Sequence, residues 1–177
     1  MIEYVQVGYV WIVQWTWRAL PLLVTLTLML VGNLPLHAFQ GGIPTPDFAL
    51  MSVFFWAMHG PAFMPAWAVF VIGGSQDFAA GTPIGFWILI YLFAYGFTLT
   101  QRVFFKGRTG IGVWLGFVLV ASITALLTWL LGMLIFERWL NPIDLIAQGL
   151  VSLMFYPLFA RLFLGVRRLL TTAPEGL

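Results

Sequence analysis

Charged residues are scarce in this chain: aspartate, glutamate, lysine and arginine together make up 8% of its 177 residues. Soluble domains carry roughly 25%. Hydrophobic residues account for 62%, and the uncharged stretches do not resemble the roughly ten-residue alternating strands of outer-membrane barrels. Because about 20 apolar residues span the hydrocarbon core as a helix, the composition excludes an ordinary soluble domain and predicts an all-α integral membrane protein.

Cysteine is absent, which excludes a disulfide, a thiolate metal site and a cysteine nucleophile. The net charge of +2 is too small to indicate a nucleic-acid partner. No G-x-S-x-G, H-E-x-x-H, Walker or dinucleotide-binding pattern occurs. The sequence therefore predicts neither an enzyme nor a bound cofactor. A basic n-region and a small-residue cleavage site are also missing at the start, so we expect no removable signal peptide.

The apolar stretches divide the chain into an N-terminal segment, a membrane domain and a tail. Residues 1–18 are rich in tyrosine and tryptophan, which collect at membrane interfaces. This segment either lies at the interface or merges with the first span. A transmembrane helical domain is expected over residues 19–165 and a cytoplasmic tail over residues 166–177. The predicted spans are residues 19–39, 48–58, 62–76, 84–100, 111–136 and 143–164.

The basic residues restrict how often the chain crosses the bilayer. Arg18, the loop from Arg102 to Arg108 and the tail hold seven of the eight basic residues, and the positive-inside rule places all three in the cytoplasm. An even number of crossings must therefore separate Arg18 from Arg102. We expect about six transmembrane helices with both termini cytoplasmic. The alternative is four spans and a re-entrant hairpin over residues 48–76. Arg138 is expected to anchor the opposite interface.

Asp77 is the most conspicuous polar residue in the apolar part of the chain. A carboxylate inside a span is costly, so it should face protein or water rather than lipid. It could serve as a proton or ion site, or as a polar contact to a partner helix. The alternative that we favour is a cap at the outer interface, which accepts backbone N–H bonds from the turn around residues 78–81.

Other candidates have mainly structural interpretations. Gly73 precedes Asp77 by four residues, and Gly81 and Gly85 follow it at four-residue steps. This spacing is compatible with close helix packing, most simply within the chain. Asp47 follows Pro46 and precedes an apolar run, as a helix N-cap does. The two histidines, His37 and His59, lack the spacing of a metal pair on one helix face, so no metal site is predicted. Asn141, Pro142 and Asp144 predict the start of the last span.

The order of these features resembles the MreD family of bacterial rod-shape-determining membrane proteins, over roughly residues 44–164. The residues that carry the resemblance are Pro46-Asp47-Phe48, Gly60-Pro61, the series Gly73, Asp77, Gly81, Pro83 and Gly85, and the basic stretch from Arg102 to Arg108. No single one of these motifs is diagnostic. The segment before Arg18 matches no pattern of the family.

The resemblance implies a non-catalytic inner-membrane subunit of the cell-elongation complex. Its implied partners are MreC, which has a single membrane helix, and through the complex MreB, RodA and a class B transpeptidase, besides the lipid bilayer. The implied fold is similar to the substrate-binding subunits of energy-coupling-factor transporters. Carried over by position, Pro46, Asp47, Asp77, Gly81 and Gly85 are the family-like residues, and Gly73 joins them as a candidate for structure or partner contact.

Three classes of function follow from the sequence. The first is a scaffold that positions a single-helix partner. The second is the substrate-binding membrane subunit of a small-molecule transporter, which would need a hydrated cavity lined by polar groups. Such groups are few outside Asp77, Asn33 and Gln148. The third is a membrane enzyme, for which no reactive constellation is visible.

Overall fold

The computed structural model describes residues 19–33, 45–105, 110–136 and 142–172, and this part of the chain is entirely helical apart from its turns. It contains six helices: Ala19–Asn33, α2 (Phe48–His59), α3 (Ala66–Ala80), α4 (Phe86–Phe105), α5 (Gly110–Phe136) and α6 (Pro142–Thr172). The predicted all-α class is confirmed. Two of the helices, over Gly110–Ile135 and Pro142–Arg168, are long and apolar enough to cross a membrane.

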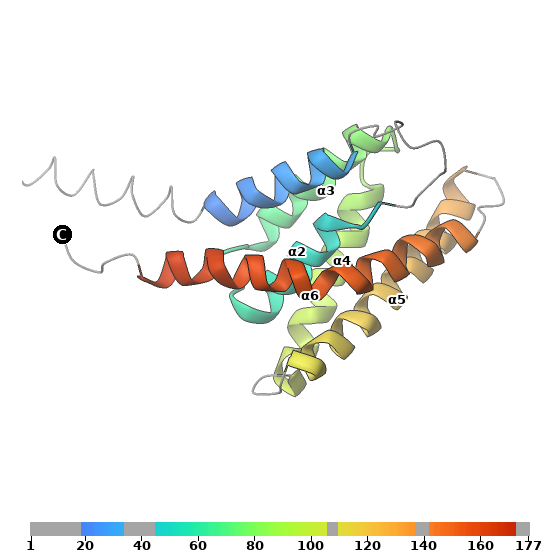
Figure 1. Ribbon diagram of the computed structural model, residues 1–177. Coiled ribbons are helices and arrows are strands. Elements are labelled where there is room, and N and C mark those ends of the chain that lie inside the picture. The colour runs from blue at the N-terminus through green and yellow to red at the C-terminus, as the bar shows by residue number, and fades with distance from the viewer. Residues whose placement is uncertain (1–18, 34–44, 106–109, 137–141, 173–177) are drawn as a thin grey trace, which may run out of the picture.

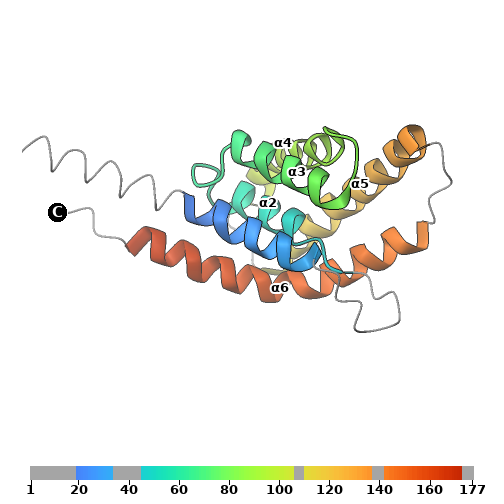
Figure 2. The ribbon, with the colours of Figure 1, turned by 90° about the horizontal axis from the view of Figure 1, so that it is seen from above.

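The shortest helix, α2, lies at the centre of the bundle. Every residue from Ala49 to Met58 is buried, whereas an amphipathic helix would bury only one face. This agrees with its composition, since a helix that is apolar on all sides is expected to be enclosed. Figures 1 and 2 show it between the helix Ala19–Asn33, α3, α4 and α6. The other helices are thus arranged around a 12-residue core helix.

Aromatic rings join α2 to α5 and α6. Phe117 of α5 stacks on Tyr156 of α6 with ring centroids 4.2 Å apart. Phe54 of α2 contacts both rings, at 5.3 and 5.6 Å. Phe55, its neighbour, contacts Phe163 of α6 at 5.3 Å. Aromatic pairs in this range are worth about 0.5–1.5 kcal/mol beyond the area that they bury, so these contacts hold the two long helices against the core.

Charged side chains separate to opposite ends of the bundle. Asp47 precedes α2, Asp77 lies in the last turn of α3 and Asp144 lies in the first turn of α6. These helix ends gather at the upper right of Figure 1, which we call the acidic end. Arg102 lies near the end of α4, and Arg161, Arg167 and Arg168 lie in the last part of α6. We call this opposite side the basic end.

Helix bounds differ from the predicted spans at several places. Helix α3 begins at Ala66 rather than at the predicted residue 62. Pro65, which has no N–H to donate, precedes its first turn in an extended conformation. We expected this span to end at residue 76, but the helix continues to Ala80, so Asp77 lies inside it. Both α4 and α6 are longer than predicted and continue to Phe105 and Thr172.

Some predictions fall outside the described residues. These concern the N-terminal segment 1–18, His37, Lys106, Arg108, Arg138 and Asn141. Pro142 does stand at the first position of α6, with Asp144 in the first turn, as expected.

Candidate functional site

Asp77 lies in the last turn of α3 and is 1% exposed. Its Oδ1 accepts hydrogen bonds from Thr82 Oγ1 at 2.9 Å and from the Trp87 backbone N–H at 2.8 Å. Its Oδ2 accepts one from the Gly85 backbone N–H at 2.8 Å. The expected donors in residues 78–81 are therefore not the ones that its side chain binds. Asp77 caps the start of the next helix instead.

The Asp77 carboxylate does what the side chain of an N-cap residue would normally do for α4. The first N–H groups of a helix have no partner within the helix, and Gly85, which directly precedes α4, has no side chain to accept from them. The Asp77 carboxylate of the preceding helix supplies the acceptor. A negative group at a helix N-terminus is also favoured by the helix dipole. Asp77 thus fixes the position of α4 relative to α3.

Two glycines shape the turn between these helices. Gly81 ends α3 in the left-handed conformation, with φ of 65°, and its N–H donates to the Asp77 carbonyl oxygen. Gly85 has φ of 108°, a conformation that side chains disfavour. The turn can therefore fold back tightly enough to bring residues 82–87 onto the Asp77 carboxylate.

Gly73 lies where α3 approaches the backbone of α4. A Cβ atom at this position would lie 2.6 Å from Ile88 Cα and 2.8 Å from Ile88 N, distances at which two atoms overlap. Gly73 therefore serves close packing within the chain. Its neighbour Gly74 is less constrained, because a Cβ there would meet only the end of the Ile88 side chain at 3.7 Å.

Asp47 joins three helices. Its Oδ1 accepts from the Leu50 backbone N–H at 2.9 Å, as an N-cap of α2 does, and from the Tyr91 hydroxyl of α4 at 3.1 Å. Its own N–H donates to Ser152 Oγ of α6 at 2.9 Å. Pro46, beside it, accepts a bond from the Phe48 N–H at 3.0 Å. The predicted cap is present, and it also reaches α4 and α6.

Both carboxylates accept hydrogen bonds from residues of α4. Asp77 binds the backbone of Trp87 and Asp47 binds the hydroxyl of Tyr91, one helical turn further on. Nearby, Asn33 Nδ2 donates to Gln76 Oε1 at 2.9 Å and so links the helix Ala19–Asn33 to α3. We call this set of hydrogen bonds at the acidic end the polar clasp. All its acceptors and donors named here belong to the chain itself.

The space around Asp47 is small. Two cavities, of about 30 and 40 Å³, share Asp47, Trp87 and Gln148 in their linings. Cavities of this size hold at most a few water molecules. The residues that the structure describes also contain no group of three or more histidine, aspartate or glutamate side chains that could hold a metal ion. One ring nitrogen of His59, Nδ1, is already hydrogen-bonded to the Phe55 carbonyl oxygen of its own helix at 3.1 Å.

Sequence reasoning missed the partners of both carboxylates. A tyrosine in the middle of an apolar span, such as Tyr91, is a signal that could have been used, because a buried hydroxyl needs a hydrogen-bond partner. Thr82 and Ser152 carry no such signal. Threonine and serine in membrane helices commonly bond to their own backbone, as Ser152 also does to Gln148 O at 2.8 Å.

The comparison with protein families identifies the chain. The family model for the rod shape-determining protein MreD matches residues 12–166, most of its length. The chain belongs to the MreD family. No curated protein and no solved structure matches it, so the expected likeness to energy-coupling-factor subunits has no support from these comparisons. The matched range contains the whole polar clasp, and membership of the MreD family implies a role in determining rod shape.

Proposed function

We propose that this protein is a non-catalytic subunit of the cell-elongation complex that holds MreC, and through it the peptidoglycan synthases, in position in the inner membrane. The observation that carries the proposal is the use of two carboxylates, of which Asp77 is buried and Asp47 is partly buried. Asp47 and Asp77 bind donors of their own chain. Polar groups used to fix the helices favour a scaffold over a catalyst, since catalysis needs groups that face a substrate.

The surface that we assign to the partner is the turn between α3 and α4. Phe78 and Ile84 flank this turn and are 77% and 75% exposed. The Asp77 carboxylate fixes the shape of the turn through Thr82 and Gly85. A rigid apolar turn can bind another helix at a low cost in conformational entropy. In this proposal Gly81, Gly85 and Asp77 act by shaping the contact rather than by touching MreC.

A pull-down from native membranes tests the scaffold. The tagged protein should recover MreC, and Phe78→Ser and Ile84→Ser should reduce the recovery severalfold. Val103→Ser provides the control, because Val103 is 77% exposed but lies at the other end of α4. Equal recovery from all variants would remove the turn as the contact. Failure of the unaltered protein to recover MreC would reject the scaffold itself.

The same proposal includes six crossings, with both termini in the cytoplasm. The separation of the acidic and basic ends supports it, because the positive-inside rule puts the arginines in the cytoplasm. The 12 residues of α2 measure about 18 Å, less than the roughly 30 Å hydrocarbon core. This length suffices here because α2 is enclosed by other helices, so its ends meet protein rather than lipid. A re-entrant hairpin remains the rival topology.

Cysteine labelling tests the topology without background, since the chain contains no cysteine. Ile84→Cys and Val103→Cys are matched variants, 75% and 77% exposed at the two ends of α4. A membrane-impermeant maleimide should label Ile84→Cys in intact spheroplasts and Val103→Cys only after lysis. The opposite pattern would invert the topology, and labelling of both from outside would show that α4 does not cross.

The transporter alternative fits the site less well. The two cavities at Asp47 measure about 30 and 40 Å³, whereas pockets for small-molecule ligands measure about 300–1,000 Å³. Two larger grooves, of about 480 and 660 Å³, have mainly apolar linings rather than the polar groups that a hydrated substrate cavity needs. A stoichiometric metabolite found by mass spectrometry of the purified protein would favour the transporter nevertheless.

A further inference from the structure

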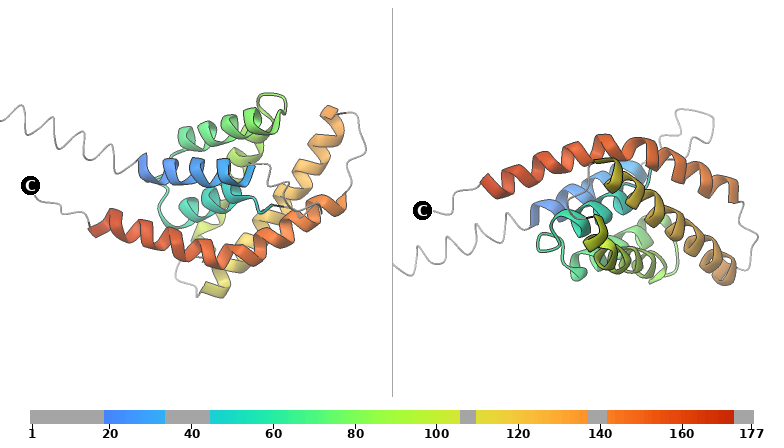
Figure 3. Two further views of the ribbon diagram at one scale, coloured as in Figure 1. Left: turned by 45° about the horizontal axis from the view of Figure 1, so that its top comes forward. Right: turned by 90° about the horizontal axis from the view of Figure 1, so that it is seen from below.

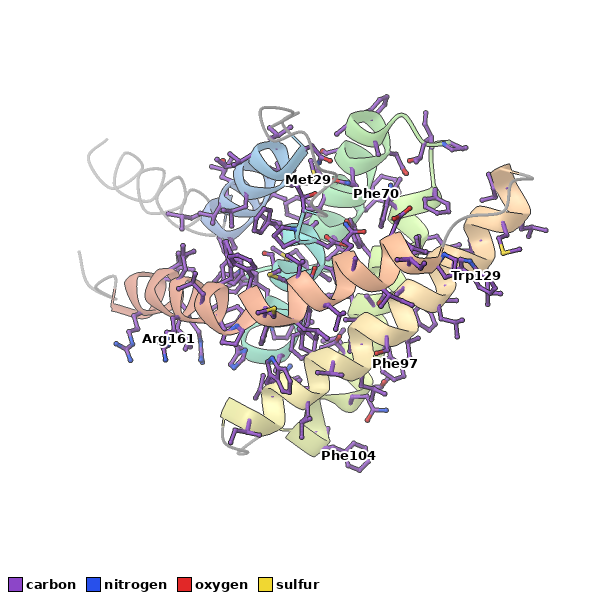
Figure 4. All side chains as sticks on the ribbon, turned by 45° about the vertical axis from the view of Figure 1, so that its right-hand side comes forward. Met29, Phe70, Phe97, Phe104, Trp129 and Arg161 are labelled. Atoms are coloured by element: carbon purple, nitrogen blue, oxygen red, sulfur yellow. The ribbon has the colours of Figure 1, made fainter. Side chains whose placement is uncertain are left out.

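An open groove lies between α5 and α6 at the basic end of the bundle. Its volume is about 660 Å³, within the range of about 300–1,000 Å³ that ligand sites occupy. Apolar side chains form most of its lining. Two basic side chains interrupt them: His59 from the end of α2 and Arg161 from α6. Figure 4 shows Arg161 on the outer surface of α6.

The course of α6 opens this groove. Pro157 lies inside α6 and lines the groove, and a proline within a helix removes one backbone hydrogen bond and bends the helix. Figure 3 shows α6 bent along its middle part, with α5 crossing it obliquely. The two helices therefore diverge beyond their crossing, and a space between them is left open to the side.

Arg161 lies about one bilayer-core length along α6 from the start of that helix. The hydrocarbon core is about 30 Å thick and takes about 20 residues of a helix to cross. Counted from the start of α6 at Pro142, that length ends near Leu162. The side chain of Arg161 can therefore reach the interface, while the apolar lining of the groove lies beside the acyl chains.

The charge of the groove is of one sign. The aspartates that the structure describes, Asp47, Asp77 and Asp144, all belong to the acidic end. Arg161 and His59 line this groove instead. With Nδ1 of His59 directed to the Phe55 carbonyl oxygen, its Nε2 is the nitrogen left for a ligand. The groove thus combines an apolar channel with a positive charge at interface depth.

We infer that this groove binds an anionic phospholipid of the cytoplasmic leaflet, with the phosphate at Arg161 and an acyl chain along α5 and α6. The inference rests on the proposed topology, because anionic lipids face the cytoplasm. A second groove between the same helices, of about 480 Å³ and lined by Ala125 and Gly149 among others, has no ionisable side chain in its lining. It provides a control of comparable volume without the charge.

Native mass spectrometry of the full-length protein, titrated with phosphatidylglycerol or phosphatidylcholine, tests the charge. We expect phosphatidylglycerol to bind more tightly than phosphatidylcholine, and Arg161→Gln to weaken phosphatidylglycerol binding about fivefold, the effect of one basic residue at the surface. Arg102→Gln removes a charge at the same end outside the groove and should leave the affinity unchanged. Equal losses in the two variants would indicate non-specific attraction and overturn the inference.

A second pair of variants tests the groove. Ala160→Trp fills the charged groove and should weaken binding of both lipids, whereas Ala125→Trp fills the uncharged one and should not. Inorganic phosphate should not displace the lipid, and displacement would indicate a soluble ligand instead. If Ala160→Trp spares lipid binding but lowers recovery of MreC, the groove belongs to a partner helix and the inference fails. The labelling of α4 distinguishes such a failure from a wrong topology.

Discussion

The indole Nε1–H of Trp114 on α5 donates a hydrogen bond of 3.1 Å to the carbonyl oxygen of Leu153 on α6. Leu153 lies four residues before Pro157, whose missing N–H would otherwise bond to this carbonyl. An unpaired carbonyl is costly where water is excluded. The tryptophan of one long helix therefore compensates for the proline of the other.

Trp114→Phe should lower the thermal stability of the purified protein, by about 0.6–1.7 kcal/mol as for other hydrogen bonds between membrane helices. In a Pro157→Ala background the Leu153 carbonyl regains a backbone donor, so the same substitution should cost less. Thermal denaturation of the four proteins of this double-mutant cycle measures the coupling. Trp67→Phe, at a ring that is 59% exposed, serves as a control. Equal costs in both backgrounds would contradict this account of Leu153.

Asp77→Asn should destabilise the protein by about 1–3 kcal/mol, the cost of a buried donor left without an acceptor. Both carboxylate oxygens accept bonds, so the amide NH₂ of asparagine must face a donor in one of the two positions. Urea or thermal unfolding in detergent measures the loss. Asp144→Asn, at an exposed residue in the first turn of α6, should change stability by under about 0.5 kcal/mol. If Asp77→Asn left the stability unchanged, the turn would have to rearrange freely.

Gly73→Ala should destabilise the contact between α3 and α4 by about 1–3 kcal/mol, as overpacking does. The added methyl group would lie 2.6 Å from Ile88 Cα, and backbone atoms cannot move aside as a side chain can. Gly74→Ala, at the next residue, adds the same group at 3.7 Å from a side-chain end. It should be neutral or stabilising, because alanine favours helices over glycine. Melting temperatures of the two variants test this contrast, and equal values would contradict the close approach.

Tyr91→Phe should cost about 1–2 kcal/mol, because it removes the hydroxyl that donates to Asp47. Tyr95→Phe, one turn further along α4 at a residue that is 7% exposed, is the matched control and should cost less. Cysteine accessibility at Thr45, an exposed residue beside the clasp, gives a local measurement. Greater labelling of Thr45→Cys in the Tyr91 variant would show that Asp47 no longer holds α2 to α4. Unchanged labelling and stability would remove Tyr91 from the clasp.

Much of the fold could be predicted because the bilayer restricts the choices. A charged fraction of 8% predicts that most of the chain lies in lipid. There a helix satisfies the backbone N–H and C=O groups by hydrogen bonds within one segment. Asp47 caps α2 as its position indicated, whereas α3 was predicted to begin at residue 62 and begins at Ala66, after Pro65. The end of α3 was misplaced, because the glycines after Asp77 indicated a loop. Those glycines shape the turn, and the helix continues up to them.

The sequence by itself determined that this is a helical membrane protein of the MreD family with its charges near helix ends. It could not determine which apolar run is central, because a segment facing lipid and a segment enclosed by protein have the same composition. Only the tertiary structure placed α2 in the middle, brought Ile88 against Gly73 and directed Tyr91 to Asp47. These relationships depend on how helices distant in sequence pack together, and hydrogen bonds with a reach of about 3 Å form only once that packing is fixed.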